Sequence, residues 1–189
     1  MHRGAKTTVI VLLNNNLSLI AIATPLGQMI GGATDEGVCF CEFNENPLSE
    51  FNYKSFSQFF EIETSQTLNP HLKTLKIQLD EYFEGKRKEF SIPIAVRGTD
   101  FQHKVWAQLQ HIPYGTTQTY KQQSKNLNQP LAIRAMAHAN GQNPIAIMIP
   151  CHRVIGTNGK LTGYAGGLWR KKWLLEHERN NCPLNGTLF

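Results

Sequence analysis

Short runs of apolar residues alternate with turn-forming residues over the first part of the chain and predict β-strands there. The runs cover residues 8–13, 19–24, 28–33 and 38–43, and residues such as Asn, Pro and Gly separate them. Residues 34–37 have the composition of a hairpin loop. We therefore expect an N-terminal sheet of short strands.

A change to spacings of three and four predicts an amphipathic helix over residues 68–84. Its apolar positions are Leu68, Leu72, Leu75, Leu79, Tyr82 and Phe83. Gly85 ends the helix, and the extended stretch over residues 89–97 is typical of a linker. The pattern predicts an N-terminal α/β domain over residues 1–90 and a second domain over residues 91–189.

Helical spacing dominates the second half of the chain. Residues 101–111 form one predicted helix, for which Asp100 is the candidate N-cap. Residues 169–178 form another, whose expected inward-facing side chains are Trp169, Trp173 and Leu174. The predicted fold class is therefore α+β, with a small N-terminal α/β domain followed by a mostly helical C-terminal domain.

Two short helices joined by a tight turn are predicted between the helix over residues 101–111 and the helix over residues 169–178. Thr119 is the candidate N-cap of a helix over residues 120–127, and Pro130 suits the first turn of a second helix that runs to Asn140. Gly141 fits the left-handed position just past that helix. The pair matches a helix-turn-helix of winged-helix type, and an ordinary helical hairpin is the alternative that the spacing leaves open.

Composition narrows the class of protein. The 189 residues are 41% hydrophobic and 17% charged, which excludes intrinsic disorder, collagen and a coiled coil. The longest apolar stretches, residues 8–13 and 145–150, fall far short of the roughly eighteen residues of a membrane helix. No small-residue cleavage site follows the first stretch, so we expect no secretory signal and no membrane association. The expected location is the cytoplasm, or the nucleus in a eukaryote.

The net charge of +5 hides an asymmetry between the two halves. Residues 1–89 carry eight Lys or Arg against eleven Asp or Glu, whereas residues 90–189 carry eleven against three. A strongly basic half points to a polyanionic partner such as nucleic acid. An ordinary solvated basic surface is the alternative.

The four cysteines lie at positions 39, 41, 151 and 182, without the spacing of a zinc site or a disulfide framework, so we expect no metal. Cys39 and Cys41 are two apart in a predicted strand and are expected on one face of it as small apolar fillers. Cys151 differs, because it directly follows the apolar run 145–149 and Pro150, the pattern of a buried strand or core segment.

Cys151 has His152 and Arg153 as its next neighbours, and positive charge beside a thiol favours the reactive thiolate. On a fully extended chain the thiol and the imidazole would point to opposite sides. The chain must therefore turn at Pro150, or a water molecule must relay the proton between them. A packed, unreactive thiol is the alternative at this point.

A glycine-rich loop at residues 162–167 and a carboxylate, Glu178, follow downstream. Glu178 lies near the C-terminal end of its predicted helix, where the helix dipole disfavours an anion, so a cationic partner would stabilise it. His152 is a candidate partner and would complete a Cys-His-Glu chain. A Lys or Arg partner on a solvated helix end is the alternative.

These residues together resemble the O6-alkylguanine-DNA alkyltransferase family. The resemblance rests on Ile-Pro-Cys-His-Arg-Val at 149–154, Asn-Pro at 143–144, Tyr-Ala-Gly-Gly at 164–167, Trp-Leu-Leu-Glu-His-Glu at 173–178, Pro-Tyr-Gly at 113–115, Tyr120 and Arg134. It is strong over residues 92–180, and Pro-Leu-Gly at 25–27 echoes the family's variable N-terminal domain. The resemblance implies irreversible, single-turnover DNA repair without a cofactor, in which an alkyl group passes from O6-alkylguanine to the protein. O4-alkylthymine is a second candidate substrate.

The resemblance also implies roles for the residues around the thiol. Cys151 would accept the alkyl group, and His152 would take the thiol proton through a water molecule. Glu178 would hold His152 in the right tautomer, and Asn143 would tie the cysteine loop to the preceding segment. Tyr120 would place its hydroxyl near guanine N3, where it stabilises charge that develops on the departing base.

The substrate site implied by the resemblance combines main-chain and loop residues. The carbonyls of Cys151 and Val154 would accept from the guanine amino group, and the backbone of Tyr164 and Ala165 would donate to O6. Pro150 and Gly166 complete this predicted site. Because the loop carries Gly166 and Gly167 where some members have a bulky residue, we expect a roomier pocket that admits O6-benzylguanine.

The implied partner is double-stranded DNA that contains O6-alkylguanine, bound by a protein that is a monomer in solution, with cooperative binding along DNA left open. The second helix of the pair would enter the minor groove, and Arg134 would fill the space that the flipped-out nucleotide leaves. Ala135 suits close approach to DNA and equally suits tight helix packing, and Lys121 and Lys125 are candidate phosphate contacts. Further candidate phosphate contacts are Lys104 and the basic run Arg170, Lys171 and Lys172.

Three other functions compete with repair. A non-catalytic protein that only binds alkylated DNA would lack a reactive cysteine. A helix-turn-helix regulator would read sequence in the major groove. A cysteine hydrolase would use the same Cys-His-Glu chain over many turnovers.

Overall fold

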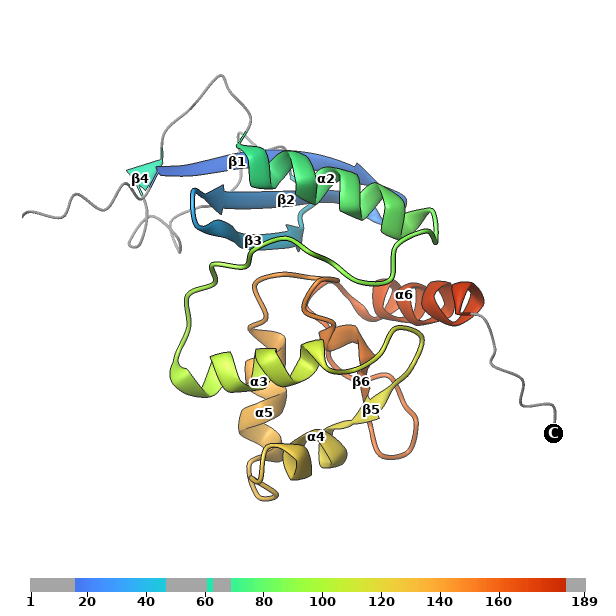
Figure 1. Ribbon diagram of the computed structural model, residues 1–189. Coiled ribbons are helices and arrows are strands. Elements are labelled where there is room, and N and C mark those ends of the chain that lie inside the picture. The colour runs from blue at the N-terminus through green and yellow to red at the C-terminus, as the bar shows by residue number, and fades with distance from the viewer. Residues whose placement is uncertain (1–15, 47–60, 63–68, 183–189) are drawn as a thin grey trace, which may run out of the picture.

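The computed structural model describes residues 16–46, 61–62 and 69–182, and it has the α+β architecture that the sequence predicts. A sheet and one helix form an N-terminal layer, and the remaining helices form a second layer below it (Figure 1). The predicted strand over residues 8–13 and the first predicted helical position, Leu68, lie outside the described residues.

The N-terminal sheet consists, within the described residues, of strands β1 (Asn16–Thr24), β2 (Gly27–Thr34), β3 (Gly37–Phe43) and β4 (Glu61–Ile62), in the order β3-β2-β1-β4. Strands β1, β2 and β3 are antiparallel neighbours, and β4 pairs in parallel with β1. The three predicted strands in this part of the chain and the hairpin between β2 and β3 are confirmed.

Helix α2 (Pro70–Phe83) covers one face of this sheet (Figure 1). Asn69 caps it by accepting a hydrogen bond from the backbone N–H of His71, and the chain leaves it through Gly85 with φ of +74°. Its buried face carries the predicted apolar positions Leu72, Leu75, Leu79 and Tyr82.

The predicted single face for Cys39 and Cys41 is wrong. The register between β2 and β3 shifts at Gly32 and Ala33, so that Ala33 pairs with Val38 and Gly32 pairs with Phe40. This β-bulge leaves Cys39 as the extra residue and breaks the alternation of faces. Cys41 therefore packs in the main core, and Cys39 packs in a separate small cluster.

The C-terminal layer contains α3 (Asp100–Gln110), β5 (Gln118–Thr119), α4 (Tyr120–Asn126), α5 (Ile133–Gly141), the single 3-10 turn η2 (Cys151–Arg153), β6 (Val154–Ile155) and α6 (Leu168–Asn181). Helix α3 starts one residue earlier than predicted, and its N-cap is Thr99, which forms a reciprocal capping box with Gln102. Asp100 is instead the first helical residue, where its charge suits the helix dipole.

The predicted pair of short helices is confirmed, with different limits for the second. Thr119 caps α4, which ends with Asn128 at φ of +55° and the backbone hydrogen bonds of a Schellman motif. Helix α5 begins at Ile133, so Pro130 lies in the preceding turn. Gly141 is the last helical residue and not the left-handed residue after the helix.

The outer edge of β3 joins the two layers. Val38 exchanges backbone hydrogen bonds with the segment around Ile94, and Cys41 does so with Pro144 and Ala146. One cluster of buried apolar side chains extends from Ile22 in the sheet to Leu174 in α6. Side chains from both sides of the predicted domain boundary near residue 90 thus pack in one core. The boundary itself stays a prediction.

Candidate active site

The segment before Cys151 is buried, as the sequence predicts, but it is a series of tight turns and not a strand. Met148 N–H bonds to the Ala146 carbonyl, and Cys151 N–H bonds to the Ile149 carbonyl, each across a single residue. The first of these turns holds Ile147 at φ of +72°, a strained conformation for a β-branched residue. The second turn is centred on Pro150, the position where the sequence requires the chain to bend.

Asn143 holds these turns together through both ends of its side-chain amide. Its Nδ2 donates to the Ile149 carbonyl at 2.7 Å and to Cys151 Sγ at 3.1 Å, while its Oδ1 accepts from Ile145 N–H at 3.0 Å. A donor aimed at the sulfur stabilises negative charge there. Asn143 therefore fixes the loop and touches the candidate nucleophile at the same time.

The Cys151 thiol lines a cavity of about 80 Å³. Tyr120, Gly163 and Tyr164 also line it, together with Ala137, Asn140 and Gly141 of helix α5. Burial raises the pKa of Cys151, and the hydrogen bond from Asn143 and the charge of Lys171 lower it only in part. The Arg153 guanidinium donates to Glu178 and to the Ile112 carbonyl, and burial outweighs the charge of Lys171, so the thiol of the free protein is neutral.

Glu178 is completely buried and accepts, from the described residues, five hydrogen bonds. Oε1 accepts from His152 Nε2 at 2.8 Å, Tyr82 Oη at 2.9 Å and Arg153 Nη2 at 2.9 Å, and Oε2 accepts from Arg153 Nε at 2.8 Å and Gly115 N–H at 3.1 Å. Burial alone would raise the pKa of Glu178, but His152 and Arg153 outweigh burial and hold it well below its usual range. Both candidate partners, the imidazole and a basic side chain, thus contact this carboxylate, and Glu178 is buried rather than on the solvated surface of the helix.

His152 is held as a neutral base. Because Glu178 is ionised and can only accept, His152 Nε2 carries the proton in their hydrogen bond, which leaves Nδ1 with its lone pair. Nδ1 is buried and has no hydrogen-bond partner among the described residues, so it makes no direct hydrogen bond to Cys151 Sγ. Burial lowers the pKa of His152, which keeps the imidazole neutral at pH 7.

Lys171 belongs to the site, although the sequence suggests a phosphate contact. It is completely buried, and its Nζ donates to the carbonyls of Val154, Thr162 and Gly163 at 2.7, 2.7 and 3.1 Å. Burial lowers its pKa to about 8. Arg170 is also buried, where it donates to the Leu26 and Gly166 carbonyls, so of this basic run only Lys172 is exposed.

The N-terminal layer supplies groups to the site that the sequence did not reveal. Tyr82 donates its hydroxyl to Glu178, and the backbone of Cys41 holds the turn segment at Ile145. The sequence could have indicated a buried hydrogen bond of Tyr82, because a tyrosine on the buried face of a helix needs a partner for its hydroxyl. Only the folded chain shows which partner that is.

The predicted substrate-binding residues do not all face the cavity. Tyr164 lines it, and its hydroxyl is buried with no hydrogen-bond partner among the described residues. The Val154 carbonyl already accepts from Lys171 and retains a second lone pair. Ala165 is exposed, one residue beyond the cavity wall.

The predicted roomier pocket is not found. A Cβ atom on residue 166 would stand 2.8 Å from Phe43 and 2.9 Å from the Tyr164 ring, so those side chains already fill the space that Gly166 leaves. At about 80 Å³ the cavity is also well below the roughly 300 Å³ at which small-molecule sites begin.

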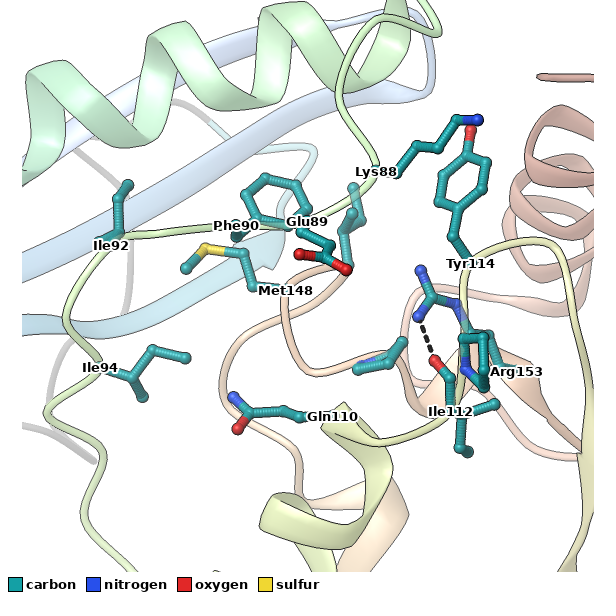
Figure 2. A pocket seen from close by; sticks show the side chains of 13 residues that line it. Lys88, Glu89, Phe90, Ile92, Ile94, Gln110, Ile112, Tyr114, Met148 and Arg153 are labelled. Atoms are coloured by element: carbon teal, nitrogen blue, oxygen red, sulfur yellow. Dashed lines mark hydrogen bonds between the residues drawn. The ribbon is translucent and has the colours of Figure 1, made fainter. Parts of the chain in front are cut away.

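Pro150 lines a different hollow, of about 580 Å³, which lies between the linker segment and the C-terminal layer. Figure 2 shows this hollow with Lys88, Met148 and Tyr114 around it, and with Arg153 bonded to the Ile112 carbonyl at 2.6 Å. The Cys151 thiol does not line it. Pro150 therefore shapes the cysteine turn and is not part of the wall of the cavity at the thiol.

The predicted DNA-binding residues lie together on the α4–α5 pair. Tyr120 lines the Cys151 cavity and donates to the Thr162 carbonyl at 3.5 Å, and burial raises its pKa. The side chains of Lys121, Lys125, Arg134 and Ala135 are all exposed.

The residues described here contain no cluster of three or more His, Cys, Asp or Glu side chains suited to a metal ion. None of the helices described is long and apolar enough to cross a membrane.

Comparison with protein families gives two matches that divide the chain. Residues 20–96 match the ribonuclease-like domain of 6-O-methylguanine DNA methyltransferase. Residues 100–180 match the DNA-binding domain of the same family.

Individual relatives and solved structures agree with these matches. The chain is 48% identical over 140 residues to a methylated-DNA–protein-cysteine methyltransferase of Mycolicibacterium paratuberculosis, with 73% of this chain and 85% of the relative covered. It is 42% identical over 156 residues to one of Methanosarcina acetivorans, with 82% and 94% covered. The crystal structure of the Mycobacterium tuberculosis O6-methylguanine methyltransferase superposes with a TM-score of 0.74 at 36% identity, covering 89% of this chain and 96% of that one. A structure of the Mycobacterium tuberculosis protein in complex with DNA superposes with a TM-score of 0.71 at 37% identity and the same coverage.

Proposed function

The chain belongs to the family of methylated-DNA–protein-cysteine methyltransferases, and from this premise we propose that it repairs O6-alkylguanine in DNA by transfer of the alkyl group to Cys151. The observation that carries this proposal is the placement of the Cys151 thiol in a cavity wall, with Asn143 on the sulfur and the buried His152–Glu178 pair behind it.

The transfer is a direct displacement at the alkyl carbon. A bond forms between Cys151 Sγ and that carbon while the bond from the carbon to guanine O6 breaks. The thiol proton passes through a water molecule to His152 Nδ1. This buried nitrogen has a lone pair and accepts no hydrogen bond from the described residues. The departing guanine takes up one proton in return, so that each reaction exchanges a hydrogen on sulfur for an alkyl group.

The raised pKa of Cys151 explains why this thiol needs a base. The free protein holds a neutral thiol beside a neutral imidazole, so little charge is buried until substrate arrives. As the proton leaves, Glu178 stabilises the imidazolium, and Asn143 stabilises the sulfur. Tyr120 at the cavity wall is placed to donate to the departing base.

The product is a neutral thioether, which no group near Cys151 can cleave. Each molecule therefore acts once, without a metal or a methyl donor. The stoichiometry of transfer is one alkyl group per chain, which separates this proposal from a cysteine hydrolase.

DNA is bound through the α4–α5 pair in the minor groove. Exposed Lys121 and Lys125 contact phosphates, Ala135 allows close approach, and Arg134 fills the space left by the flipped nucleotide. Because the cavity is small in the free protein, Tyr164 and its loop must shift when the base enters. We extend the proposal to O4-alkylthymine as a second substrate and to a monomeric protein that finds lesions on duplex DNA.

Mass spectrometry of the intact protein and its peptides, after incubation with duplex DNA containing O6-methylguanine, tests the proposal. We expect one methyl group per molecule, located on Cys151. Cys182 is the internal control, because it is also a partly exposed cysteine, outside the Cys151 cavity. Unmodified protein that still binds the lesion would instead identify a non-catalytic binding protein, and tight binding to one sequence without a lesion would identify a regulator.

A further inference from the structure

Two apolar side chains are exposed in and just after the turn that joins α4 to α5. Leu131 is 99% exposed, and Ile133, the first residue of α5, is 38% exposed. Single exposed apolar residues are common and mean little alone. Here two of them flank Ala132 at the tip of one element, and Arg134 follows directly.

Helix geometry relates this tip to the Cys151 cavity. Ile133, Ala137 and Gly141 are four residues apart and therefore lie along one face of α5. Ala137 and Gly141 line the cavity, so Ile133 stands one turn, about 6 Å, beyond the cavity wall on the same face. Leu131 lies in the turn between α4 and α5, and Figure 1 shows this connection at the end of the described structure farthest from the N-terminal sheet.

The charge around the two side chains identifies their partner as a polyanion. Residues 119–140 contain Lys121, Lys125 and Arg134 and no Asp or Glu. A protein-binding patch is usually depleted of lysine, whereas an apolar tip framed by exposed cations suits the minor groove of DNA between its two phosphate backbones. Arg134 can replace hydrogen bonds and stack in an opened duplex, and the two apolar side chains beside it can cover base and sugar surface that one side chain leaves open.

We propose that Leu131 and Ile133 form an apolar wedge that holds the duplex open beside Arg134, an inference that rests on the proposed repair of duplex DNA. Leu131 enters the minor groove and packs on the base step next to the vacated position. Ile133 packs on the sugar of the nucleotide that has moved into the Cys151 cavity. Both are positioning residues, since neither contacts the atoms that react.

The test compares single-turnover methyl transfer from O6-methylguanine in a duplex with transfer from the same strand without its complement. The variants are Leu131→Ser and Ile133→Ser, with Leu131→Met as the variant that restores apolar volume. Ile77→Ser is the matched control, because Ile77 is 56% exposed on helix α2, away from the tip.

We expect Leu131→Ser to slow transfer from the duplex about tenfold and transfer from the single strand less than about twofold, because a wedge matters only where bases are stacked and paired. Ile133→Ser should show a smaller loss with the same duplex preference. Leu131→Met should return the duplex rate to within about twofold of the wild type, and Ile77→Ser should leave both rates unchanged.

Equal losses on duplex and single strand, or a wild-type duplex rate in Leu131→Ser, would overturn the wedge. Self-association of the wild-type protein that Leu131→Ser abolishes would assign the tip to a second copy of the chain and overturn it as well. These outcomes differ from failure of the proposed function, in which the wild-type protein itself transfers no methyl group from either substrate.

Discussion

The surroundings of Glu178 and the α4–α5 tip, residues 131–134, differ most in solvent exposure and in hydrogen bonding. Around Glu178, buried side chains from both layers converge on one carboxylate that accepts hydrogen bonds on both oxygens. At the tip, Leu131, Ile133 and Arg134 are exposed. The side chains around Glu178 are therefore held in a fixed arrangement for proton transfer in the free protein. The side chains at the tip make contacts only when a partner binds.

Substitutions in these two regions should differ in whether they change stability together with activity. A buried, multiply bonded charge cannot lose one partner without leaving another unpaired, so changes near Glu178 should affect folding and chemistry together. Exposed side chains at the tip contribute little to the folded state, so changes there should affect only the handling of DNA.

The largest expected effect is the loss of transfer in Cys151→Ala, because no other atom at the cavity can accept the alkyl group. Transfer of a labelled methyl group should fall to background, while DNA affinity measured by fluorescence anisotropy stays near the wild-type value. Cys182→Ala should keep full transfer. Single-turnover transfer that persists in Cys151→Ala would remove the assignment of the acceptor.

Glu178→Gln should cost about 3–5 kcal/mol of unfolding free energy, because it leaves the Arg153 charge buried without its counterion. Urea unfolding measures the loss, and transfer should fall in the fraction that stays folded. Glu176→Gln is the matched control, since Glu176 is 47% exposed with its ion-pair partner Lys172 at 3.9 Å, and should change stability by less than about 0.5 kcal/mol. Similar stability for both variants would contradict the central role of the buried carboxylate.

Arg134→Ala should slow repair of duplex DNA about tenfold more than attack on a free O6-substituted guanine, because only the duplex requires a nucleotide to be flipped. Single-turnover rates on the two substrates give the ratio, and Arg179→Ala serves as an exposed arginine outside the α4–α5 pair. An equal loss on both substrates would mean that Arg134 does not act in flipping.

The smallest expected effect is on the pH dependence of stability. The pKa of His152 is lowered from 6.5 in the folded protein, so the unfolded chain takes up a proton first as pH falls. Stability is therefore full above about pH 6.5 and decreases below it, by about 1.4 kcal/mol for each unit by which the folded pKa lies lower. In His152→Gln, the loss of unfolding free energy between pH 7 and pH 5 should be smaller than in the wild type, and an identical loss would show that the pKa of His152 is the same in the folded and unfolded states.

Much of the architecture could be predicted from local pattern. The strands, helix α2 and the α4–α5 pair follow from hydrophobic periodicity and caps such as Thr119. Errors arose where backbone hydrogen bonds override the pattern. The bulge at Cys39 placed Cys39 and Cys41 on different faces. The apolar run 145–149 is the buried core segment that its pattern allowed beside a strand, and the bend at Pro150 lies where the sequence placed it.

The sequence by itself determined the types of group at the candidate site and their order along the chain, because Cys151, His152 and the helix with Glu178 carry a recognisable local pattern. Only the tertiary structure decided which charges face the sulfur. It turned Arg153 and Lys171 toward buried oxygens, brought Tyr82 from the other layer onto Glu178, and raised the pKa of Cys151. The reason is physical: burial and hydrogen bonding depend on contacts between distant segments, such as Tyr82 and Glu178, which are 96 residues apart, and local spacing does not encode them.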